Sequence, residues 1–173
     1  MPGPDAAKVV IAAILTAVLA WASWRDVKSR TIPNRAVLAV LALFIAWTAV
    51  GRGAGLIPDL EAAAIAFAVT FVLYLFKVIG AGDAKLFAAL ALFAGLAYLP
   101  LFALMTVLAG GCVAAISLAS SPRRALALFH LGGKGGFGRG IPYGVAIAIG
   151  GLAAVWGALT GVAARYAFTG LGG

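Results

Sequence analysis

The sequence predicts an all-α membrane protein, a polytopic bundle of about six transmembrane helices. Hydrophobic residues make up 64% of the chain, charged residues make up 10%, and the mean hydropathy is +1.11. A soluble domain of this length does not bury so much apolar surface with so few polar side chains. The long runs of Ala, Leu and Val also lack the alternation of a transmembrane barrel. We therefore expect residues 1–173 to form a single integral-membrane domain.

Turn residues and charges divide this domain into six apolar stretches. The expected spans cover about residues 9–24, 35–50, 58–78, 83–99, 101–119 and 141–164. The fourth span is expected to end just before Pro100. The first span has an alternative interpretation as a signal peptide, because Ala20-Trp21-Ala22 resembles a small-residue cleavage site. The basic cluster directly after it resists translocation and favours a membrane span.

The distribution of basic residues determines the expected orientation. Ten Lys and Arg residues fall in the loops 25–35, 77–85 and 119–140, and three fall on the opposite face. By the positive-inside rule these three loops face the cytosol, and six spans then place both termini outside. The expected location is the bacterial cytoplasmic (inner) membrane. The net charge of +8 belongs to this pattern, so we expect contacts with anionic lipid headgroups and none with nucleic acid.

Two aspartates lie at the edge of the hydrocarbon on the cytosolic side. Asp26 follows the first span, and Asp83 opens the fourth within Gly80-Ala81-Gly82-Asp83-Ala84-Lys85. Taken singly, Asp26 is a solvated acid among basic neighbours and Asp83 is a helix N-cap. Taken together they lie at the same depth on the same face, and acidic residues in membrane segments tend to be functional.

A pair of carboxyl groups in this position has a definite chemistry. At about 3 Å two carboxyl groups cannot both ionise, so one keeps its proton. The ionised member then activates water, and the protonated member polarises a peptide carbonyl. Gly80 and Gly82 lack Cβ atoms and let an extended peptide approach Asp83. Such a pair is chemically able to hydrolyse a peptide bond at the membrane edge.

The two stretches around these aspartates resemble the signatures of the type IV prepilin peptidases, which are membrane-embedded G-x-G-D aspartic proteases. The first runs from Arg25-Asp26 to Ile32-Pro33-Asn34, and the second is Gly80 to Lys85. The short length and Ile141-Pro142-Tyr143-Gly144 resemble the minimal tight-adherence (TadV/CpaA-like) branch.

The resemblance implies an endopeptidase that removes the leader of type IV (Flp/Tad-like) prepilins and pseudopilins at the cytosolic face. It implies that Asp26 and Asp83 are the catalytic pair, with supporting roles for the motif residues Gly80, Gly82, Lys85, Ile32, Pro33 and Asn34. Larger members of the family also methylate the new N-terminus and carry a cytosolic domain with four cysteines. This chain has one cysteine, so no N-methyltransferase activity is expected.

Other interpretations remain open beside the peptidase. Paired membrane acids also occur in small ion-coupled or proton-coupled transporters. Preflagellin-type peptidases share the G-x-G-D logic, and a purely structural assembly subunit is a further class. The sequence leaves homodimer formation open.

Metal and cofactor sites are not expected. A single Cys112 permits neither a disulfide framework nor a thiolate zinc site. His130 is a lone loop histidine. The glycine-rich loop 132–140 matches G-x-G-x-x-G by spelling only, because no strand precedes it, so it predicts no nucleotide site.

Overall fold

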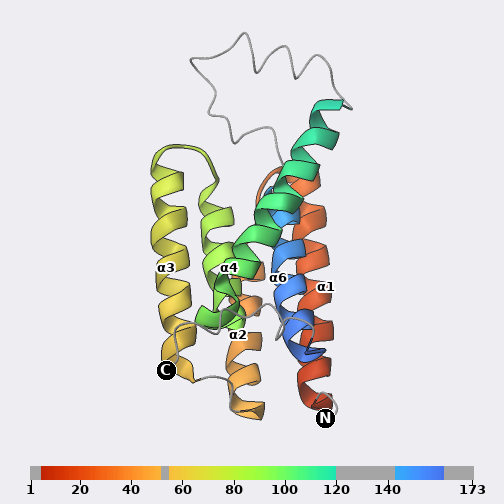
Figure 1. Ribbon diagram of the computed structural model, residues 1–173. Coiled ribbons are helices and arrows are strands. Elements are labelled where there is room, and N and C mark those ends of the chain that lie inside the picture. Colours follow the sequence, from red (N-terminus) through yellow and green to blue (C-terminus); the bar gives the residue numbers. More distant parts are fainter. Residues whose placement is uncertain (1–4, 52–54, 120–142, 162–173) are drawn as a thin grey trace.

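The computed structural model confirms the all-helical prediction for the residues that it describes, which are 5–51, 55–119 and 143–161. Within these residues lie five helices: α1 (Ala6–Ser29), α2 (Asn34–Val50), α3 (Leu56–Leu75), α4 (Ala81–Ala119) and α6 (Tyr143–Leu159). They pack along one another as an elongated bundle (Figure 1). Helices α1, α3 and α4 are long and apolar enough to cross a membrane, whereas α2 and α6 are shorter apolar helices. The fold is that of an all-helical membrane protein.

Helix α1 is longer than the expected span 9–24. It begins after Asp5, whose carboxylate accepts a hydrogen bond from the Ala7 amide. It ends where Arg30 adopts a left-handed conformation with φ of 55° and donates its N–H to the Asp26 carbonyl oxygen. Asp26 therefore lies in the last turns of a helix and not in a loop. It continues a buried stripe that recurs every three or four residues: Ile11, Ala12, Leu15, Leu19, Ala22 and Asp26.

Helices α2 and α3 each bury one narrow face. Pro33 directly precedes α2, and its carbonyl oxygen accepts a hydrogen bond from the Ala36 amide. The buried face of α3 consists of small side chains, Ala62, Ala66 and Thr70. The rest of its surface exposes large apolar side chains, including Phe67, Phe71 and Tyr74, whose rings contact one another in sequence. In water such a surface would be unfavourable, so it is expected to face acyl chains.

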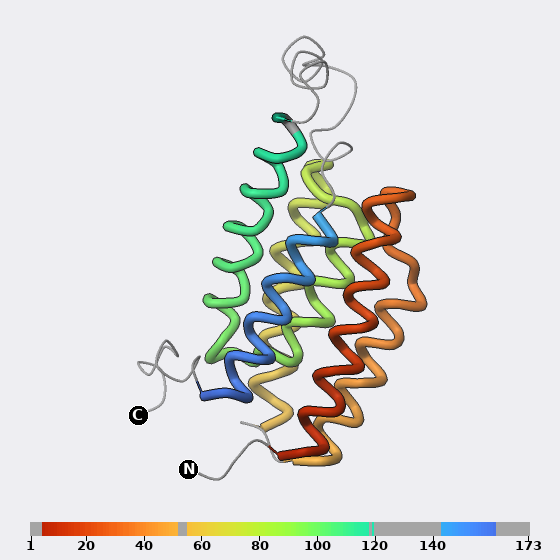
Figure 2. Tube along the Cα trace, turned by 90° about the vertical axis from the view of Figure 1, so that its right-hand side faces the viewer, coloured from red at the N-terminus to blue at the C-terminus, as the bar shows by residue number. Residues whose placement is uncertain are grey.

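Helix α4 is interrupted at Gly95, and the expected break just before Pro100 is wrong. Gly95 has φ of 58° and ψ of 178°, a conformation that is essentially restricted to glycine. The chain reverses direction there, so the two halves of α4 run antiparallel (Figures 1 and 2). Phe87 of the first half stacks on Phe102 of the second, with ring centroids 4.3 Å apart. The chain stays helical through Pro100, five residues after this interruption.

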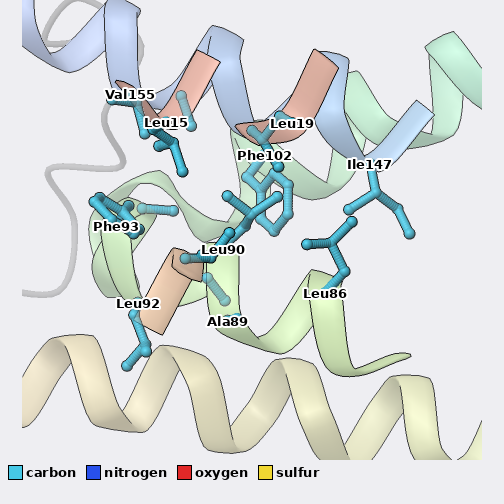
Figure 3. Packing of buried hydrophobic residues seen from close by; sticks show 14 of the residues in the cluster. Leu15, Leu19, Leu86, Ala89, Leu90, Leu92, Phe93, Phe102, Ile147 and Val155 are labelled. Carbon is cyan, nitrogen blue, oxygen red and sulfur yellow. The ribbon is translucent and has the colours of Figure 1, made fainter. Parts of the chain in front are cut away.

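The core lies between α1, α4 and α6, with α2 packed against it (Figure 3). Leu15 and Leu19 of α1 meet Leu90 and Phe102 of α4 in this cluster. Helix α6 approaches α4 closely because it presents glycine: a Cβ at Gly150 would lie 3.0 Å from the Phe102 carbonyl oxygen. In a membrane such close packing, and not water exclusion, is the main source of helix association.

The segments that carry the two aspartates and their sequence motifs lie at one end of this bundle. The end of α1 and the starts of α2, α4 and α6 all lie at the upper end in Figure 1. At the lower end Lys8 contacts Gly51, and Asp59 of α3 lies beside Gly95. His130, the glycine-rich stretch 132–140 and the outer parts of the expected sixth span lie outside the described residues.

Candidate active site

Asp26 connects the end of α1 to the start of α6. Its side chain is 5% exposed, and its Oδ2 accepts a hydrogen bond of 2.8 Å from the Gly144 amide. Gly144 is the second residue of α6, where backbone N–H groups have no partner within the helix. A carboxylate is favoured at this place because the helix dipole is positive at its N-terminal end. Asp26 thus caps a helix that begins far away in the sequence.

Asp83 lies in the first turn of α4. Its Oδ2 accepts a hydrogen bond of 3.0 Å from the amide of Gly80, the residue directly before the helix. This is the backward-reaching half of a capping box, in which an acidic third residue bonds to the N-cap amide. The expected capping role is therefore present, although Gly80 and not Asp83 occupies the N-cap position.

The two aspartates lie at the same end of the bundle, near enough for their charges to interact. The charge of Asp26 acts on Asp83, and the charge of Arg30 acts on Asp26. Backbone amides bind Oδ2 of both aspartates, and no described residue bonds to either Oδ1.

Ile32 fills the space between the starts of α4 and α6. A Cβ at Gly82 would lie 3.1 Å from the Ile32 Cβ, and a Cβ at Gly144 would lie 3.0 Å from the Ile32 Cδ1. The same Cβ at Gly144 would lie 2.8 Å from the Asp26 Oδ2. Both glycines are needed for this packing, which places the first motif against the second.

The remaining motif residues have different places. Pro33 directly precedes α2, while Asn34 and Lys85 are exposed at the starts of α2 and α4. The structure shows no contact between these two exposed side chains and the carboxyl groups, within the described ranges. Their expected supporting roles stay predictions.

Sequence reasoning did not assign two residues at this site, Tyr143 and Gly144. Gly144 bonds to Asp26, and the charge of Asp83 acts on the half-buried Tyr143. In the sequence, both residues belong to the Ile-Pro-Tyr-Gly stretch that opens the last expected span. That stretch entered only through the family resemblance, because nothing local connects it to an aspartate 118 positions away.

The chemistry of the site is that of paired carboxyl groups. Within the described part of the chain, no three His, Cys, Asp or Glu side chains gather as metal ligands would. Two neighbouring carboxyl groups, one ionised and one protonated, can supply one base and one acid to the same bond.

Comparison with known proteins identifies the family of this chain. The model of the type IV leader peptidase family matches residues 13–115, more than half of the chain and a range that includes both aspartates. No match was found among the curated proteins or among the solved structures. The family match also makes the chain a membrane protease, in agreement with its long apolar helices. We conclude that this chain belongs to the type IV leader peptidase family.

Proposed function

We propose that the chain is a membrane-embedded aspartic endopeptidase of the G-x-G-D type. Its substrates are type IV prepilins of the Flp/Tad-like kind and pseudopilins, from which it removes the leader peptide. The observation that carries this proposal is the meeting of Asp26 from α1 and Asp83 from α4 at one end of the bundle. Each has one oxygen bound by a backbone amide at the start of a helix.

In the proposed reaction the pair acts on water and on the scissile peptide bond. The ionised carboxylate takes a proton from water, and the oxygen adds to the peptide carbonyl carbon. The protonated carboxyl group donates a hydrogen bond to the carbonyl oxygen as negative charge develops there. The tetrahedral intermediate then releases the amine, which leaves with a proton, and the leader keeps the new carboxyl group.

The membrane placement is part of the proposal. Six spans, both termini outside and an active site at the cytosolic face of the inner membrane follow from the basic residues. The reversal at Gly95 supports the span count, because it divides α4 into two antiparallel halves. Contacts with anionic lipid headgroups belong to the same cytosolic rim.

No observation favours the transporter interpretation. A cation path would need polar groups directed into the bundle along its length. The hydroxyl groups of Thr16, Thr70 and Thr106 instead donate to carbonyl oxygens of their own helices, four residues earlier. Thr16 also accepts a hydrogen bond from the Trp156 indole, which connects α1 to α6.

The proposed function is tested by incubating the purified chain in detergent with a Flp-type prepilin and reading the product masses. We expect the leader and the mature pilin as separate products, and no further mass from a methyl group when a methyl donor is present. The prepilin incubated without the chain is the control. A preflagellin in a parallel reaction distinguishes the two peptidase classes. Intact prepilin after prolonged incubation with folded protein would contradict the proposal.

A further inference from the structure

We propose that Gly144 is a positioning residue for the leader-cleavage reaction. In this inference the amide of Gly144 fixes the Asp26 carboxylate, and the absence of a side chain at Gly144 leaves the carboxylate room to take its reactive position. The inference rests on the proposed function, and it extends the active site to the start of α6. This part of the chain lies outside the region that the family model matches.

The contacts of Gly144 are of two independent kinds. Its N–H donates to the Asp26 Oδ2 at 2.8 Å in a buried position. A Cβ built at Gly144 would lie 2.8 Å from that same oxygen, 3.1 Å from the Asp26 Cγ and 3.0 Å from the Ile32 Cδ1. The distance to the Asp26 Oδ2 is shorter than real Cβ contacts, and the other two distances are tighter than most of them. Any other residue at this place must therefore displace the carboxyl group, the isoleucine or α6 itself.

The backbone of Gly144 does not itself require glycine. Its φ lies outside the left-handed region, and the residue is helical. At an ordinary helical position alanine is more favourable than glycine by about 0.8–1 kcal/mol. The need for glycine at this position therefore comes from the space that Asp26 and Ile32 occupy.

The expected consequence is a loss of rate and not of substrate binding. Gly144 contacts the catalytic carboxyl group, and a misplacement of about 1 Å can cost about 100-fold in rate. We expect Gly144→Ala to lower kcat by about 10-fold to 100-fold while KM changes little. The measurement is the rate of prepilin cleavage at several substrate concentrations.

Two further variants separate positioning from packing. Gly111→Ala is the matched control, because a Cβ at Gly111 meets nothing within 4 Å. Ile32→Val removes the Cδ1 atom that an added Cβ at position 144 would meet. It leaves the contact between that Cβ and the Asp26 carboxyl group. We expect Gly144→Ala to lower kcat by the same factor in the Ile32→Val background as in the unchanged chain. Recovery of kcat in the double variant would show a packing role only and would overturn the proposal.

A spectroscopic measurement on the unchanged chain keeps the test independent of folding. Tyr143-Gly144 is the only Tyr-Gly pair in the sequence, so labelling tyrosine carbonyl carbon and glycine nitrogen selects the Gly144 amide. Its proton resonance is expected downfield, because the acceptor is a charged carboxylate. We expect this resonance to move upfield in Asp26→Asn. An unchanged resonance would contradict the hydrogen bond.

The outcomes for the inference and for the proposed function differ. If Asp26→Asn cleaves prepilin at the normal rate, both are overturned. If Asp26→Asn is inactive and Gly144→Ala cleaves as fast as Gly111→Ala, the positioning role is overturned and the peptidase stands.

Discussion

Replacing Asp26 with asparagine is expected to abolish leader cleavage, and so is replacing Asp83 with asparagine. Asparagine neither accepts a proton from water nor donates one to a leaving group, so each change removes one half of the acid–base pair. General acid–base catalysis contributes about 100-fold to 10,000-fold to a rate, and we expect each variant to lose at least that much. The measurement is the appearance of mature pilin by mass.

The fold is expected to survive both changes. The asparagine Oδ1 still accepts a hydrogen bond, so the amides of Gly144 and Gly80 keep a partner. The double variant is expected to be no slower than the slower single variant, because residues that act as a unit are not additive. Asp59→Asn, at the other end of the bundle, is the matched control. Cleavage at the normal rate by either single variant would refute the catalytic assignment.

The second large effect concerns stability and lies at the reversal of α4. Gly95→Ala is expected to destabilise the protein by about 1–3 kcal/mol, because its φ and ψ are essentially restricted to glycine. A Cβ there would also lie 2.7 Å from the Asp59 Oδ1. We expect the midpoint of thermal unfolding in detergent to fall by several degrees.

A pair of further variants separates backbone strain from the contact with Asp59. Asp59→Ala removes the carboxyl group, so in the double variant only the strain remains. We expect Gly95→Ala to cost more than half as much stability in the Asp59→Ala background as it costs in the unchanged chain. Gly111→Ala serves again as the control for an added methyl group in α4. If Gly95→Ala caused no loss of stability in the Asp59→Ala background, backbone strain at position 95 would not be the cause of the destabilisation.

The placement of Asp26 shows how far the sequence leads. Its position at the same end as Asp83 follows from counting spans, and the structure brings the two together. The spacing of Asp26 from Leu15, Leu19 and Ala22 could also have predicted its burial, because all four lie on the same face of α1. The basic residues around it indicated a loop instead. Helix α1 accommodates them because Arg25 and Lys28 lie on its exposed side.

The break in α4 shows where sequence signals mislead. Pro100 is a conspicuous breaker, whereas Gly95 is one of 23 glycines in the chain. The chain nevertheless stays helical through Pro100, so this proline does not mark the break. The reversal depends on φ and ψ at Gly95 and on the packing of Phe87 against Phe102, which are tertiary properties.

The role of Gly144 could not be found from local sequence at all. Its partner Asp26 lies on another helix, and the crowding by Ile32 comes from a third segment. Lys85 shows the converse: it belongs to the motif, yet its side chain is exposed. Membership of a sequence motif therefore does not determine which side chains contact one another in the fold.

The most direct test of the central claim measures whether positions 26 and 83 meet in the membrane. Cys112, the single cysteine, is first replaced with serine. Asp26→Cys is then combined with Asp83→Cys, or with Asp59→Cys as the control pair, and native membranes are treated with a short bifunctional thiol reagent. We predict rapid intramolecular cross-linking of the first pair, read as the mass of one linker, and none of the control pair. Equal rates for the two pairs would contradict a shared active site.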